Sequence, residues 1–199
     1  MPLERRPTPA PPTHVHRRSV TSLYSNLVTR PTGRAIRTGV ESQLAEMEGG
    51  PAPWLSILDF SQVRVLDYSC ADEIVAKLLL RFLGGERPAD AFFVVRGIQE
   101  HHEDAIEAVL ERHSLLLVAE DDAGVVKLLG AANPVHRAAW DSLSARGTAR
   151  ADEVAADTGL SAEAVEATLA ALVAHRVAVR HPDGAVSPLS LLLEEEEEG

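Results

Sequence analysis

Short runs of consecutive apolar residues recur along the first two thirds of the chain. Three of them stand between turn-forming residues: Trp54 to Phe60, Ala91 to Val95 and Leu115 to Ala119. Such a run is typical of a strand that is buried on both faces of a sheet, because neither face needs polar side chains. An earlier segment, Val20 to Val28, is rich in β-branched and aromatic residues and also predicts a strand.

Segments with helical periodicity separate these strands. Thr32 to Glu48, Ala71 to Phe82 and Glu100 to Arg112 each keep their apolar residues on one face. Asp121 to Gly124 predicts a tight turn, after which Val125 to Leu129 returns as a hairpin strand. Strands that alternate with helices of about 10–15 residues favour βαβ units. The predicted fold class is therefore α/β, with a mixed, largely parallel β-sheet.

A different pattern begins at Pro134. Helices are predicted for Pro134 to Ser144, for Ala151 to Thr158, and from a Ser161 cap to His175. Two short β-rich segments, Val177 to Arg180 and Ala185 to Ser187, then flank a Pro-Asp-Gly turn. Three helices followed by a hairpin are typical of a winged helix, a variant of helix-turn-helix.

Composition suggests four regions. Residues 1–18 are expected to be a disordered, basic, Pro-rich arm, and residues 191–199 a disordered acidic tail that ends in five Glu and a Gly. Residues 19–131 are expected to form the sheet domain and residues 132–190 the winged-helix-like domain.

The sheet segment carries two motifs that point to a known fold. The stretch LSILDFSQVRVLDYSCADEIVAKLLLRF resembles the STAS domain, the fold of bacterial anti-sigma-factor antagonists; the matching residues are Leu58, Asp59, Asp67, Tyr68, Ser69 and Cys70. The upstream LVTRPTGRAI, with Thr29, Arg30 and Ala35, followed by LDF and ADEI, is similar to a STAS-like family of unknown function. The resemblance covers residues 20–130 and implies a non-enzymatic bacterial regulator or adaptor that acts through protein–protein contacts.

The resemblance also implies a regulated surface at Asp67, Tyr68, Ser69 and Asp72. In the antagonists, the anti-sigma kinase phosphorylates a Ser directly after the Asp, and the added charge abolishes binding. Tyr68 stands at that position here and Ser69 follows it, which puts the usual switch in doubt. Ser69 is also expected to cap a helix, with Asp72 at the third helical position. The implied partner is a histidine-kinase-like ATPase or a sigma or anti-sigma component.

Charge bears on the alternative of a DNA-binding transcriptional regulator. The net charge is −11, and the first 50 residues form the one basic region, with seven Arg against four Glu. Phosphate contacts would come from Arg17, Arg18, Arg176 and Arg180. The third helix of the winged-helix-like module, however, turns Ala162, Glu163, Glu166 and Ala170 outward, and these are not the side chains that most often read bases.

Other motifs give no sign of catalysis or of a bound group. The chain has no nucleotide-binding glycine loop and no nucleophile elbow, and Gly33, Gly49 and Gly84 are expected at element ends. His101 and His102 are expected on a solvated helix start, and Cys70 as a buried, inert thiol. No enzyme, metal or cofactor is predicted.

The remaining expectations concern location and assembly. The chain shows neither a signal peptide nor an apolar run long enough for a membrane helix, so a cytoplasmic protein without membrane contact is expected. Self-association stays open, as does a third role as a structural subunit of a larger complex.

Overall fold

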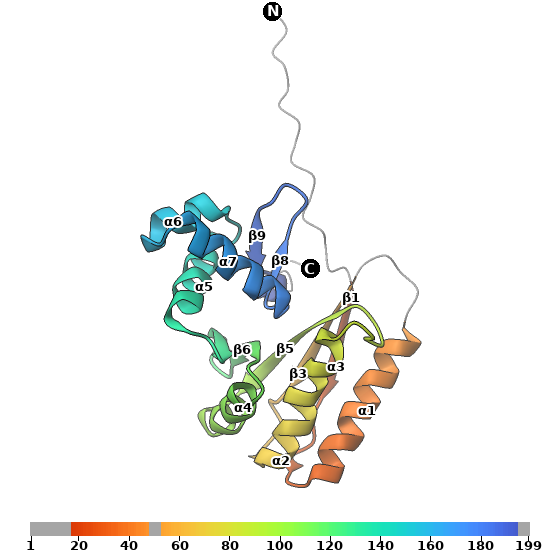
Figure 1. Ribbon diagram of the computed structural model, residues 1–199. Helices are drawn as coiled ribbons and strands as arrows, with labels where there is room; N and C mark the ends of the chain where they lie inside the picture. Colours follow the sequence, from red (N-terminus) through yellow and green to blue (C-terminus); the bar gives the residue numbers. More distant parts are fainter. Residues whose placement is uncertain (1–16, 48–52, 195–199) are drawn as a thin grey trace, which may run out of the picture.

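A five-stranded sheet forms the centre of the protein, whose computed structural model describes residues 17–47 and 53–194 (Figure 1). The strand order is β1-β3-β5-β6-β7, and all neighbours are parallel except β6 and β7. The strands are β1 (Arg17–Ser22), β3 (Trp54–Asp59), β5 (Ala91–Ile98), β6 (Leu116–Asp121) and β7 (Val126–Gly130). The chain is thus an α/β protein with a mostly parallel sheet, as the sequence pattern predicts.

Helices cover one face of this sheet. They are α1 (Arg30–Glu46), α2 (Tyr68–Ala71), the π-helical segment η1 (Asp72–Lys77), α3 (Leu78–Leu83) and α4 (Glu100–Arg112). Their apolar sides share one core with Leu58, Val95 and Leu117 of the strands. A short parallel ladder of β2 (Asn26–Leu27) and β4 (Val65–Leu66) lies just before α1 and α2 and brings the starts of these two helices together.

The C-terminal elements cover the opposite face. They are α5 (Pro134–Arg146), α6 (Ala151–Thr158), α7 (Ala162–Ala174), β8 (Ala178–Arg180), β9 (Val186–Pro188) and α8 (Leu191–Glu194). A second core joins Ile57, Val94 and Val118 of the sheet to Trp140 and Leu169 of these elements. The central strands are therefore apolar on both faces because each face packs against a different layer.

Polar contacts also hold the C-terminal elements against the sheet. The Arg176 guanidinium lies 4.2 Å from the centre of the Phe92 ring and donates to Asp90 just before β5. Arg137 of α5 donates to the carbonyl of Leu128 in β7 at 3.0 Å. Both contacts cross from the C-terminal elements to the sheet and fix their relative position.

The ends of the described chain differ from the sequence expectation. Arg17 and Arg18 belong to β1 rather than to a disordered arm, because this strand pairs with β3 in parallel from Arg17 opposite Trp54 onward. At the other end, Leu191–Glu194 form α8 rather than tail, and Arg18 donates to the carbonyl of Leu192. Residues 1–16 and 195–199, which make up most of the expected arm and tail, lie outside the described residues.

Two internal boundaries also differ. The predicted strand Val20 to Val28 is divided into β1 and β2, because the chain turns at Ser25, whose carbonyl accepts from Arg64. The predicted helix Ala71 to Phe82 begins earlier, at Tyr68, and widens into a π-helix at η1. Within the described chain, no helix combines the length and the apolar character needed to cross a bilayer.

Candidate functional site

Two sequence segments that lie more than 40 residues apart, one at Thr29 and Arg30 and one at Asp72 and Glu73, meet at one charged cluster. Thr29 caps the start of α1, and Arg30 follows it as the first helical residue. From there the Arg30 guanidinium donates to Asp72 at 2.9 Å and to Glu73 at 3.1 Å, both in η1. The Thr-Arg and Ala-Asp-Glu signatures are thus two halves of one ion-paired contact.

A glycine lets α1 approach η1 closely enough for these contacts. Arg30, Gly33 and Arg37 lie on one face of α1, since they are three and seven residues apart. A Cβ at Gly33 would lie 3.0 Å from the Cys70 carbonyl oxygen and 3.0 Å from the Glu73 Cβ, so a side chain here would force the helices apart. Gly33 therefore serves helix packing inside α1, whereas the sequence suggested an element end.

The cluster contains further basic side chains from three parts of the chain. Arg37 donates to Glu73 at 3.3 Å, and Lys77 contacts the same carboxylate at 2.5 Å. His113, at the end of α4, lies 2.9 Å from Asp72 through its Nε2 atom. We call this set the charged cluster; it comprises Arg30, Arg37, Asp72, Glu73, Lys77 and His113.

The two acids of the charged cluster are buried and stay ionised. Asp72 is 5% exposed and Glu73 0% exposed. Burial alone would raise the pKa of Asp72, but hydrogen bonds from Arg30 and His113 and the charge of Lys77 outweigh it and lower the pKa to about 2. The pKa of Glu73 is lowered in the same way, by Lys77 and Arg30 against burial. Two carboxylates held as anions are suited to fixing structure rather than to moving protons at neutral pH.

An exposed corner stands directly before this buried cluster; it comprises Asp67, Tyr68 and Ser69, and we call it the α2 corner. Asp67 is the N-cap of α2, because its carboxylate accepts from the Ser69 backbone N–H at 2.7 Å and also from the Ser69 hydroxyl. The predicted Ser69 cap is therefore wrong by two positions. Asp72 likewise holds the charged cluster together instead of completing a capping box.

Tyr68 projects from the α2 corner into solvent. Its side chain is 37% exposed, and its hydroxyl accepts a hydrogen bond from Arg112 of α4 at 3.2 Å. This bond ties the end of α4 to the corner, and the bond between His113 and Asp72 ties it to the charged cluster behind the corner. The α2 corner is thus exposed to solvent at Tyr68 but held in place by contacts with α4.

Cys70 lies immediately behind the α2 corner. It is fully buried, and its thiol donates to the Thr29 carbonyl at 3.3 Å. Burial raises the pKa of the Cys70 thiol, so the reactive thiolate is disfavoured. The structure therefore agrees with an inert thiol.

The His pair differs from the sequence expectation. His101 lies on the surface, where its Nε2 is 3.1 Å from the Arg64 carbonyl, but His102 is completely buried. The His102 Nδ1 accepts from the backbone N–H of Gln99 and so completes the cap of α4, and its ring packs near Phe60. Burial lowers the pKa of His102, which favours the neutral ring. The prediction that both His side chains lie on a solvated helix start is therefore correct for His101 and wrong for His102.

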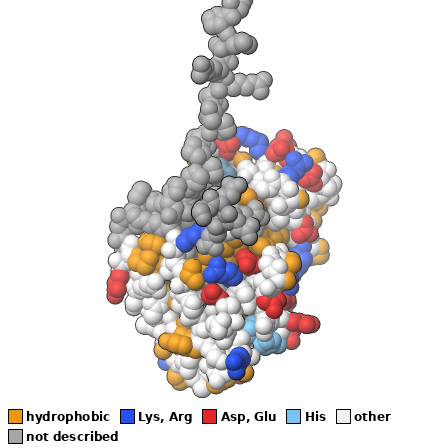
Figure 2. Space-filling model, turned by 180° about the vertical axis from the view of Figure 1, so that it is seen from behind, with side chains coloured by type: hydrophobic (Ala, Val, Ile, Leu, Met, Phe, Trp, Pro, Cys, Tyr) orange, Lys and Arg blue, Asp and Glu red, His pale blue; other side chains and the backbone are white. Residues whose placement is uncertain are grey.

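Two of the four basic residues considered for nucleic-acid contacts, Arg176 and Arg180, already form ion pairs within the chain. Arg176 lies between the sheet and α7, and Arg180 pairs with Glu166 at 2.9 Å on the exposed side of α7. Glu163 and Glu166 are exposed on that helix as predicted. On the face shown in Figure 2, acidic and basic side chains are interspersed. Arg17 and Arg18 lie in β1, at the edge of the sheet.

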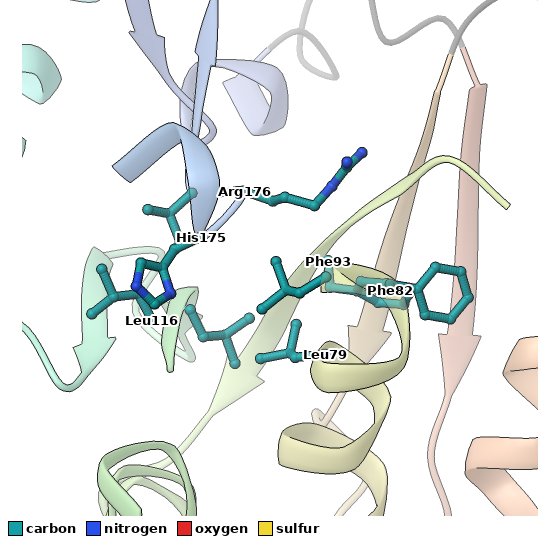
Figure 3. Close-up of a pocket in the computed structure, with 9 residues that line it drawn as sticks. Leu79, Phe82, Phe93, Leu116, His175 and Arg176 are labelled. Carbon is teal, nitrogen blue, oxygen red and sulfur yellow. The ribbon is translucent and has the colours of Figure 1, made fainter. Parts of the chain in front are cut away.

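The cavities described here are small, and the clefts are open to solvent. A cavity of about 10 Å³ between α3, β6 and the end of α7 is lined by Leu79, Phe93 and His175, and has room for a single water molecule at most (Figure 3). A wider, open cleft lies at the carboxyl ends of β3, β5 and β6, where Asp59 pairs with Arg96. Within the described residues, no group of three or more His, Cys, Asp or Glu is placed to hold a metal ion.

The sequence pointed to Asp67, Tyr68, Ser69 and Asp72 but not to most of their partners, namely Lys77, Arg112 and His113. It also did not point to Arg37, which pairs with the neighbouring Glu73. Two signals were available: the i, i+7 spacing of Arg30 and Arg37, and the i, i+4 spacing of Glu73 and Lys77. The contacts from α4 had no local signal. No protein-family model matches the chain, and a search of curated proteins finds no relative.

Proposed function

We propose that this chain is a non-enzymatic regulatory or adaptor protein that binds a protein partner through the α2 corner of a STAS-like domain. One observation carries the proposal: the exposed Tyr68 and the half-buried Ser69 stand directly before ion pairs whose carboxylates, Asp72 and Glu73, are buried. A surface that is already rigid loses little conformational entropy on binding, so this arrangement favours recognition.

The local backbone supports this proposal. The residues behind the corner form a π-helical segment, and such segments in helices are frequent at functional sites. The element order and the mostly parallel sheet are compatible with the STAS fold, in which this corner meets the regulatory partner. The expected partner is a histidine-kinase-like ATPase or a sigma or anti-sigma component.

DNA binding has weaker support. Arg176 and Arg180 already pair with Asp90 and Glu166, so phosphate contacts would have to break these pairs. The exposed acids of α7 would also face phosphates at an electrostatic cost.

The proposal is tested by affinity purification of the tagged full chain from its native host. We expect a protein that is recovered with the wild type and with Val125→Ala, an exposed control on the β6–β7 turn, but lost with Tyr68→Ala. The interaction should then be reproduced with the two purified proteins. Recovery that is equal for all three baits would refute the α2 corner as the binding surface.

A further inference from the structure

The imidazole ring of His102 is completely buried, although the residue lies in the first turn of α4. Its Nδ1 atom is 3.1 Å from the backbone nitrogen of Gln99, the residue that precedes the helix as its N-cap. A backbone N–H only donates, so Nδ1 must accept, and the neutral ring must carry its proton on Nε2. The Nε2 atom is also buried and has no hydrogen-bond partner within the residues that the structure describes. The hydrogen bond between Gln99 and His102 therefore exists in one protonation state of the ring.

The surroundings of this ring disfavour a positive charge. Phe60, just after β3, packs with its ring centre 5.9 Å from that of His102, and the His101 ring lies 4.0 Å away. Burial and the neighbouring His101 lower the pKa of His102 below its ordinary value of 6.5, although the Val63 carbonyl and the exposed Asp122 favour the charged form. The start of a helix also carries a partial positive charge, which repels a cation.

The acids of α4 itself do not supply a counterion to the buried ring. Glu100 and Asp104 are exposed, and Glu103 pairs with Lys127 at 2.6 Å. In the described part of the chain, neither nitrogen of His102 forms a hydrogen bond with a carboxylate. A protonated ring would thus be a buried cation without a partner, which is costly.

We infer that His102 is an acid-sensitive cap of α4, which opens the first turn of this helix when the ring takes up a proton from solvent. Protonation turns Nδ1 into a donor, so Nδ1 and the Gln99 N–H then face each other as two donors. The charged ring reaches water when the first turn unwinds, and this exposes Phe60. The rest of the helix stays folded because Ile106 and Val109 belong to the core beneath the sheet helices.

His101 extends this effect to the loop before β4. Its Nε2 atom lies 3.1 Å from the Arg64 carbonyl, and because a carbonyl only accepts, Nε2 carries the proton in this contact. The contact survives protonation of His101 itself, but it is lost when the first turn of α4 unwinds. The segment after Arg64 runs through β4 to Asp67, so acid also loosens the chain that leads into the α2 corner.

Amide hydrogen exchange of the full chain, followed by NMR and corrected for the intrinsic exchange rates, tests the inference. In the open turn the ring has its ordinary pKa of 6.5, so lowering the pH from 7.5 to 5.0 should favour opening by up to about thirtyfold. The faster exchange should appear at the amides of Gln99, His102 and Glu103, whose hydrogen bonds close the first turn. The amides of residues 106–110 in the same helix should change by less than about twofold.

A substitution separates the titration of the ring from the loss of the cap. His102→Asn keeps an acceptor, because its side-chain oxygen is two bonds from Cβ like Nδ1, but it does not titrate. This variant should lose the pH response of the first turn. The matched control His101→Asn, on the exposed side of the same turn, should keep the response of the wild type.

The ring nitrogens of the wild type give a second measurement if His102→Asn fails to fold. Nitrogen NMR should show Nδ1 of His102 without a proton at pH 7.5, and protonation of the ring should accompany the change of the first-turn amides. Exchange that does not depend on pH, a His102→Asn variant that responds like the wild type, or a proton on Nδ1 at pH 7.5 would each overturn the inference.

Discussion

Replacing Asp72 with Asn removes the charge of a buried carboxylate while keeping its size. Asp72 accepts from Arg30 and His113 and lies 3.5 Å from Lys77. Its folded pKa is about 2, against an ordinary value of 3.8. At 1.36 kcal/mol per pKa unit, this difference corresponds to about 2 kcal/mol of folding free energy when the group is ionised.

The pH window follows from the direction of the shift. Because the folded pKa lies below the unfolded one, the contribution is fully present above about pH 4 and is lost as the pH falls through about 2. Between pH 7 and pH 3 the wild type should lose about 1 kcal/mol through Asp72 alone. Asp72→Asn should lack this part of the acid sensitivity and should be less stable than the wild type at pH 7.

Urea unfolding at pH 7 and pH 3 measures both quantities, with Trp140 as a buried fluorescent probe. The matched control is Asp141→Asn on the exposed side of α5, which should stay within about 0.5 kcal/mol of the wild type at pH 7. If Asp72→Asn and the wild type lost equal stability between pH 7 and pH 3, the ion-paired role of Asp72 would be wrong.

Three further outcomes are expected. Arg176→Met should lower the free energy of unfolding by about 2 kcal/mol, because the contacts with the Phe92 ring and the Asp90 carboxylate are lost. Arg180→Ala removes a pair at the surface and should change this free energy by less than about 1 kcal/mol. Equal effects of the two variants in calorimetry would contradict this expectation. Burial raises the pKa of Glu107 above 4.5, so ionisation of this carboxyl lowers the stability of the fold as the pH rises. Glu107→Gln should therefore unfold at an equal or higher urea concentration than the wild type at pH 7. A clearly lower urea midpoint would refute the reasoning. The pKa of His102 lies below 6.5, so stability should fall as the pH drops from 6.5 towards the folded value, and an NMR titration midpoint at or above 6.5 would exclude the buried neutral ring.

Most of the secondary structure could be predicted from local sequence patterns. Glu100–Arg112 and Ala151–Thr158 are helices with the predicted bounds, since caps and periodicity act within a few residues. The central strands were visible as apolar runs, although the sequence did not say which layer would bury their second face.

The candidate site was harder to predict because its contacts are not local. Asp72 looked like part of a helix cap, and only the approach of α1 and α4 shows why it is buried. His102 looked solvated because its neighbours in sequence are charged, yet it lies against Phe60 from another element. Gly33 resembled a turn residue because close helix packing leaves no local signature.

The packing of both sheet faces has a consequence for how the chain can be divided. Cutting after residue 131 would separate two sequence regions but would strip Leu55, Ile57, Val94 and Val118 of their partners in α5 and α7. A fragment that ends there would expose a continuous aliphatic surface to solvent, and such a surface promotes aggregation. The intact chain should accordingly melt in a single cooperative transition, with the last third acting as a folding partner of the sheet rather than as a tethered, independently moving module.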